Sequence, residues 1–70
     1  MRRSNPNSIF LRFSENQGIY DTIFPIDGRT PYYYNELLER IPVKILQIQV
    51  IPKMNYQYFN EYIVEVEPIQ

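Results

Sequence analysis

Residues 43–51 have the sequence VKILQIQVI, an unbroken run rich in branched apolar residues that is typical of a β-strand. Apolar residues alternate with glutamine along this run, so an extended chain places the two kinds of side chain on opposite faces. We predict that one face contacts the core and that the other is more polar. The predicted core face comprises Leu46, Ile48 and Val50, and the predicted outer face comprises Ile45, Gln47, Gln49 and Ile51.

After this strand, the chain is predicted to turn at residues 52–55 and to return as a further strand over residues 56–67. The alternation is cleanest from Glu61 onward, where tyrosine and valine alternate with glutamate and isoleucine. Phe59 and Ile63 lie on the predicted outer face, together with the glutamates. We expect the two strands to be neighbours in an antiparallel sheet.

Two shorter strands are predicted nearer the N-terminus. Residues 8–13 alternate, with Phe10 and Arg12 on the side opposite the apolar stripe. A polar loop over residues 14–18 contains a glycine that can adopt positive φ, and the β-rich residues 19–24 follow it. These two runs are predicted to form a hairpin.

A helix is predicted from Pro31 to Arg40. Thr30 can cap the free N–H groups of the first turn, and Pro31 suits the first helical position, which needs no donor. Leu37 belongs to an apolar stripe at helical spacing, and Pro42 prevents the helix from continuing.

Together these elements predict an α+β domain with the order strand, strand, helix, strand, strand. One helix is expected to pack on one face of a small antiparallel sheet. Residues 1–7 are predicted to form a flexible polar arm, because their turn-forming residues have no regular period. Residues 8–70 are predicted to form a single small domain.

The residue types present argue against catalysis. The chain has no histidine and no cysteine, which removes the commonest general base, a common nucleophile and the ligands of soft metals. Its acidic residues lack the spacing of a calcium loop, and its two glycines are too few for a phosphate-binding loop. We predict a protein that is not an enzyme, with no catalytic residue, metal site or cofactor.

Nucleic-acid binding is the alternative hypothesis for function. Arg2, Arg3 and Arg12 lie near the N-terminus with no acidic residue among them, and Arg12 shares a predicted strand face with Phe10. Arginine can neutralise a phosphate while an aromatic ring stacks on an unpaired base. The formal net charge of −1 and the presence of only two lysines weigh against this hypothesis.

Protein binding is the leading hypothesis. A sheet covered by one helix leaves its other face open, and an exposed face with apolar residues is typical of an interaction surface. Three consecutive tyrosines cannot all point to one side of a helix, because they span about 200°. We expect an accessory subunit, adaptor or inhibitor that binds a protein partner, as a homo-oligomer or as a subunit of a larger complex. The predicted interface residues are Tyr32, Tyr34, Ile45, Ile51, Phe59 and Ile63.

A cytoplasmic location without membrane contact is expected. The basic N-terminus is not followed by the apolar stretch of a signal peptide. The longest apolar runs are a few residues long, whereas a membrane-spanning helix needs about 20.

Overall fold

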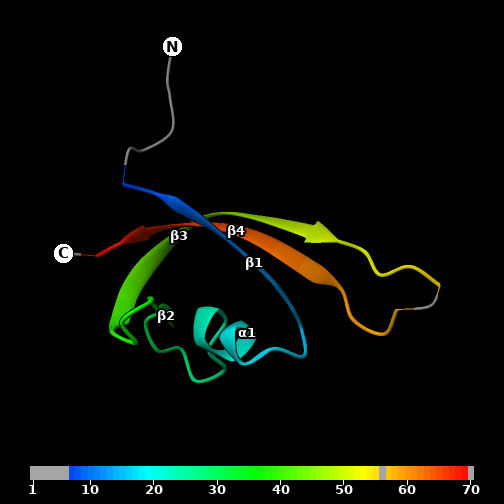
Figure 1. Ribbon diagram of the computed structural model, residues 1–70, viewed down its shortest axis with the longest axis horizontal. Coiled ribbons are helices and arrows are strands. Elements are labelled where there is room, and N and C mark those ends of the chain that lie inside the picture. Colours follow the sequence, from blue (N-terminus) through cyan, green and yellow to red (C-terminus); the bar gives the residue numbers. More distant parts are fainter. Residues whose placement is uncertain (1–6, 56, 70) are drawn as a thin grey trace, which may run out of the picture.

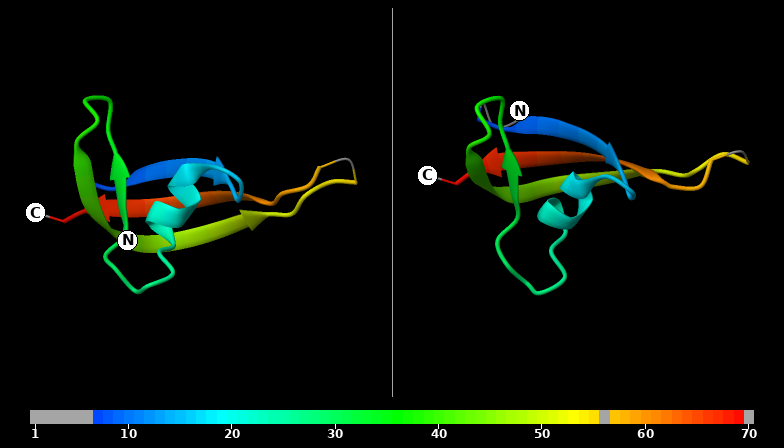
Figure 2. Two further views of the ribbon diagram at one scale, coloured as in Figure 1. Left: turned by 90° about the horizontal axis from the view of Figure 1, so that it is seen from below. Right: turned by 60° about the horizontal axis from the view of Figure 1, so that its bottom comes forward.

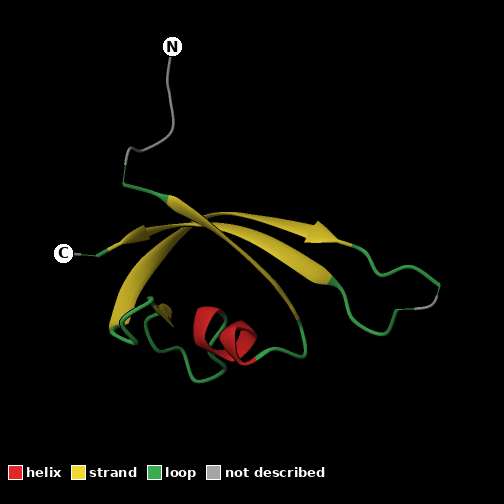
Figure 3. Cartoon of the chain, in the orientation of Figure 1, coloured by secondary structure: helices red, strands yellow, loops and turns green. Residues whose placement is uncertain are grey.

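The computed structural model describes residues 7–55 and 57–69. Within these residues, four antiparallel strands and one short helix make up the fold (Figure 1). The strands lie in the order β1-β4-β3-β2, so the first and last strands are neighbours. Figure 3 shows how loops connect them. The elements are β1 (Ile9–Ser14), α1 (Gly18–Ile23), β2 (Tyr32–Tyr34), β3 (Arg40–Ile51) and β4 (Glu61–Pro68).

Three of the predicted strands are present as β1, β3 and β4. The alternation in β1 is as predicted, because Phe13 is buried while Phe10 is 66% exposed. β4 begins at Glu61, later than predicted, and Tyr58 lies in the preceding loop with its side chain 84% exposed. The tyrosines before Glu61 favoured a strand in the prediction, but this segment is a loop.

The strand predicted at residues 19–24 is wrong, because this segment forms the helix α1. Its apolar residues recur at positions 19, 20, 23 and 24, a spacing that places them on one side of a helical turn. Ile23 is fully buried, and Ile19, Tyr20 and Phe24 pack against the core. The β-branched residues favoured a strand, but packing of this stripe outweighs that local preference.

The helix predicted from Pro31 does not form, and this segment contributes the strand β2 and a tight turn. The Asn35 side chain fixes the turn, because its Oδ1 accepts hydrogen bonds from the N–H groups of Leu37 and Glu39, both at 2.9 Å. Leu38 has a left-handed φ of 61°, which a turn tolerates and a helix does not. The observed order is therefore strand, helix, strand, strand, strand.

A β-bulge at Leu46 changes which residues of β3 face the core. Ile45 lies opposite Val66 of β4, whereas beyond the irregularity Ile48 lies opposite Val64. Opposed residues of an antiparallel pair point to the same face, and both valines are buried. Odd-numbered residues therefore face inward before the bulge and even-numbered residues after it. The predicted outer position of Ile45 is wrong, because its side chain packs against the core.

The buried core joins α1 to three strands. Phe13 lies at its centre, with its ring centroid 6.0–6.4 Å from those of Tyr20, Phe24 and Tyr62. Figure 2 shows that the end of the sheet formed by the β3–β4 hairpin extends well beyond α1. The fully buried hydrophobic residues are Phe13, Ile23, Val43, Val64 and Val66.

Candidate protein-interaction surfaces

The described part of the chain exposes more large hydrophobic side chains than it buries. Five hydrophobic residues are buried, whereas twelve large ones are exposed. Scattered exposed apolar residues are ordinary, but a concentration of them indicates an interaction site. Six of the twelve lie in β3 or in the following loop: Leu46, Ile48, Val50, Met54, Tyr58 and Phe59.

Three of these residues lie on β3 itself, and we call them the β3 apolar surface: Leu46, Ile48 and Val50. They are 39%, 47% and 48% exposed, so the prediction that they belong to the core is wrong. Ile48 does lie opposite a buried residue, Val64, and points to the same face. A helix of about ten residues was expected to cover this face, whereas α1 has six residues and leaves this end of the sheet uncovered (Figure 2).

The same part of β3 has a free edge. β4 pairs with residues 43–51 on one side, whereas β2 pairs only with residues 40–42. The next residue of β3, Val43, donates its N–H to the carbonyl of Pro31 at 2.9 Å, so its edge is also paired. Beyond Val43, no described residue pairs with β3 on the β2 side. Residues 45–51 contain no charge and no proline, two devices that protect natural edge strands from pairing, so the bulge at Leu46 is the feature of this stretch that interrupts the edge.

The predicted nucleic-acid residues Arg12 and Phe10 share the outer face of β1. The Arg12 side chain donates two hydrogen bonds to Oε1 of Glu61, from Nε at 3.0 Å and from Nη2 at 2.8 Å. Three glutamates of β4 alternate along the strand and point to this same face. A phosphate would therefore compete with Glu61 for Arg12 and meet further negative charge. Arg2 and Arg3 lie outside the described residues.

Tyr32 and Tyr34 lie together on one face of β2. Their ring centroids are 5.6 Å apart in an edge-to-face arrangement, and Cζ of Arg40 lies 4.0 Å from the Tyr32 ring centroid. This geometry is a cation–π contact. Tyr34 is 54% exposed, so this cluster presents an aromatic ring to solvent, although from a strand and not from the predicted helix.

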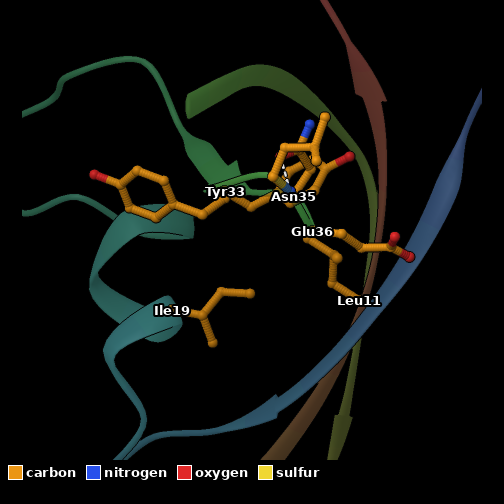
Figure 4. A pocket seen from close by; sticks show the side chains of 7 residues that line it. Leu11, Ile19, Tyr33, Asn35 and Glu36 are labelled. Atoms are coloured by element: carbon orange, nitrogen blue, oxygen red, sulfur yellow. Dashed lines mark hydrogen bonds between the residues drawn. The ribbon is translucent and has the colours of Figure 1, made fainter. Parts of the chain in front are cut away.

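An open groove of about 510 Å³ lies between β1, α1 and the β2–β3 turn. Figure 4 shows that Leu11, Ile19 and Tyr33 converge on it from three elements. Its polar side chains include Glu36 and Asn35. The Asn35 amide already makes hydrogen bonds with Leu37 and Glu39 of the same turn. Among the described residues, no group of acidic side chains is arranged to hold a metal ion. The groove therefore offers mainly apolar contacts.

The predicted interface residues do not form one surface. Ile51 and Ile63 are half-buried on the outer face of the sheet, and Phe59 is exposed in the loop before β4. Tyr32 and Tyr34 lie near the other end of β3. Sequence reasoning missed the β3 apolar surface, although the uncharged run over residues 45–51 carried a usable signal.

A hydrogen bond between two elements changes the acidity of Tyr62. Its hydroxyl donates to Oε2 of Glu15 at 2.9 Å, which joins β4 to the loop after β1. This hydrogen bond, with the loss of hydration around the ring, raises the pKa of Tyr62 to about 12. A group whose pKa is raised by folding stabilises the fold below its unfolded pKa of about 10. That contribution is lost as the pH rises through about 12.

We therefore expect the free energy of unfolding to fall more steeply between about pH 10 and 12 in the wild type than in Tyr62→Phe. Urea denaturation followed by circular dichroism at several alkaline pH values measures this difference. Tyr58→Phe is the control, because Tyr58 is 84% exposed and should leave the alkaline slope unchanged. Parallel losses in the wild type and Tyr62→Phe would contradict the assigned role of the Glu15 hydrogen bond.

No family model matches this chain, and comparisons with curated proteins and with solved structures find no similar protein. Over residues 7–55 and 57–69, no helix is long and apolar enough to cross a membrane. The surfaces of the molecule are therefore the basis for a functional argument.

Proposed function

We propose that this protein is a small non-catalytic binding module that docks to protein partners through the β3 apolar surface. It would act as an accessory subunit, adaptor or inhibitor. The observation that carries this proposal is the excess of exposed over buried large hydrophobic residues, twelve against five in the described chain. Aromatic residues near this surface, such as Phe59, would add contacts of the kind enriched at interfaces.

Burial of the β3 apolar surface would supply part of the binding free energy. Full burial of one large aliphatic side chain contributes about 1.5–3 kcal/mol. Leu46, Ile48 and Val50 retain 39–48% of their exposure, so covering all three would contribute about 2–4 kcal/mol. Because association itself costs about 4–15 kcal/mol, a stable complex also needs contacts beyond these three residues.

Nucleic-acid binding has less support. Arg12 is held by Glu61 at 2.8 Å, and the neighbouring face is acidic. Fluorescence anisotropy with labelled single-stranded DNA and RNA at low salt separates the two proposals. Tight binding that Arg12→Ala weakens would favour the nucleic-acid alternative over docking to protein.

Copurification with two charge variants tests the docking proposal. Val50→Lys places a charge in the β3 apolar surface, while Leu37→Lys makes the same kind of change at a residue that is 76% exposed elsewhere. After crosslinking in the source cells, we expect Val50→Lys to retain about tenfold less bound protein than the wild type, because the lysine must be desolvated on docking. Leu37→Lys should retain it.

Circular dichroism must show that both variants are folded. Equal retention of bound protein by the wild type and Val50→Lys, or no protein bound in near-stoichiometric amount by the wild type, would contradict the proposal. Copies of the chain carrying two different tags reveal whether the bound protein is a second copy.

A further inference from the structure

We infer that the free edge of β3 pairs with the same edge of a second copy, in an antiparallel ladder centred on Ile48. This inference rests on the proposed function and names its partner. Two features of the described chain carry it: the unpaired edge beyond Val43, and the sequence ILQIQVI at residues 45–51, which is nearly symmetric about Ile48. A two-fold symmetric dimer needs a patch that is complementary to itself.

The faces of the two strands match in this register. Opposed residues of an antiparallel pair share a face of the sheet. With Ile48 opposite Ile48 of the second copy, Gln47 lies opposite Gln49 on the outer face. The bulge residue Leu46 then falls beside Val50, so the regular ladder comprises residues 47–49 of each copy and is bounded by apolar side chains. Glutamine amides would hydrogen-bond across the outer face, while Ile48 and its counterpart would contact each other on the inner face.

Charge selects this register over its neighbours. A shift of the centre to Gln47 would place Lys44 opposite Val50 of the second copy, and a shift to Gln49 would place Lys53 opposite Ile45. With the centre at Ile48, the uncharged run pairs entirely with itself. The lysines then lie at the ends of the ladder, Lys44 opposite Pro52 and Lys53 opposite Val43, whereas each shift moves one of them against a residue of the uncharged run, which costs solvation of the charge.

The ends of the ladder also fit. Pro52 has no N–H, so the ladder ends where Pro52 of one copy lies opposite Lys44 of the other. The residue before Lys44, Val43, already donates its N–H to the carbonyl of Pro31 in its own chain. An open groove of about 620 Å³ lies at that position, between residues 28–31 and residues 43–45. In the inferred dimer, the loop that begins at Pro52 of one copy arrives at this groove of the other.

That loop carries Met54, which is 60% exposed and whose flexible apolar side chain suits an irregular groove. The other free edge of the described sheet differs. β1 carries Arg12, a charge of the kind that discourages edge pairing. We therefore expect a closed dimer rather than a continuous fibre of sheets.

Solution mass gives the first test. Light scattering over a dilution series should show a mass of twice 8.5 kDa that falls towards 8.5 kDa on dilution. Ile48→Lys places two lysines against each other at the two-fold axis and should weaken dimerisation by about a hundredfold or more. Ile48 is 47% exposed in the single chain, so the variant should fold, and circular dichroism checks this. Leu37→Lys should dimerise like the wild type.

Crosslinking tests the register, because the natural chain contains no cysteine. Opposed residues of an antiparallel pair have Cα atoms about 4.5–5.5 Å apart, a distance that a disulfide spans. Ile48→Cys alone should therefore crosslink to itself on mild oxidation. Gln47→Cys mixed with Gln49→Cys should crosslink more efficiently than either variant alone.

A wild-type chain that stays at 8.5 kDa at every concentration would overturn the inference. A dimer that Ile48→Lys leaves intact, or that Ile48→Cys does not crosslink, would also overturn it. The proposed function fails differently. If the wild type is a monomer but Val50→Lys loses an unrelated protein partner, docking stands and self-pairing is wrong. If no protein of either kind binds, both fail.

Discussion

The Phe13→Ala variant is expected to lose roughly half of the stability of the domain. Phe13 is 2% exposed, and its ring contacts the rings of Tyr20, Phe24 and Tyr62 with centroids 6.0–6.4 Å apart. Truncating a buried phenylalanine to alanine costs about 3–5 kcal/mol, because burial is lost and a cavity remains. A domain of this size is stable by about 4–10 kcal/mol, so the variant should lose roughly half of its stability and unfold at a much lower urea concentration.

Urea denaturation followed by circular dichroism measures the effect. Phe10→Ala is the matched control, since it lies on the same strand and its side chain is 66% exposed on the opposite face. The control should change the free energy of unfolding by less than about 1 kcal/mol, as surface substitutions usually do. Equal destabilisation by the two variants would contradict the assignment of the core face of β1.

The Ile23→Ala variant is expected to lose about 2–5 kcal/mol, the range found for buried aliphatic residues replaced by alanine. Ile23 is fully buried in a cluster with residues of β1, β3 and β4, so it fastens α1 to the strands. α1 has six residues and would not be stable alone. Loss of this anchor should therefore release the helix as well as leave a cavity.

Thermal unfolding and hydrogen exchange of residues 18–23 measure both consequences. Ile26→Ala is the control, because the same substitution three residues later removes a side chain that is 97% exposed. We expect Ile26→Ala to leave the melting temperature nearly unchanged. A melting temperature of Ile23→Ala that matches the control would show that α1 does not pack as described.

Segments whose apolar residues alternate could be predicted from the sequence, and segments whose apolar spacing fits both a strand and a helix could not. β1, β3 and β4 follow from alternation, because a pattern of period two supports no competing helix. Residues 19–24 are rich in β-branched residues, yet their apolar spacing also fits a single helical turn. Packing of Ile23 in the core decides between the two, and that contact is not visible in the sequence.

The β2–β3 turn shows a second limit. Thr30, Pro31 and Pro42 fit the two ends of a helix, whereas Asn35 accepts the hydrogen bonds that close a turn. The sequence therefore contains a pattern for a helix and a pattern for a turn, and the pairing of β2 with β3 favours the turn. A local pattern therefore could not determine this segment.

The candidate surface was predictable only in part. Tyr34 and Phe59 are exposed, although Tyr34 lies in a strand and Phe59 in a loop, and Ile45 faces the core because of the bulge at Leu46. A β-bulge inserts one extra residue into a strand, so residues of the same parity face opposite sides of the sheet before and after it. The alternation of residue types in the sequence does not reveal where this happens. The shortness of α1, which leaves Ile48 exposed, likewise depends on tertiary structure.

Residue-level surface labelling tests the central claim, that the β3 apolar surface is a docking site. The dilute purified chain and the chain recovered in its cellular complexes would be labelled with a photoreactive diazirine and compared by mass spectrometry. We predict that Leu46, Ile48 and Val50 are labelled in the dilute chain and protected in the complex, while Leu37, 76% exposed, is labelled in both. Equal labelling of the β3 apolar surface in the two samples would contradict the account.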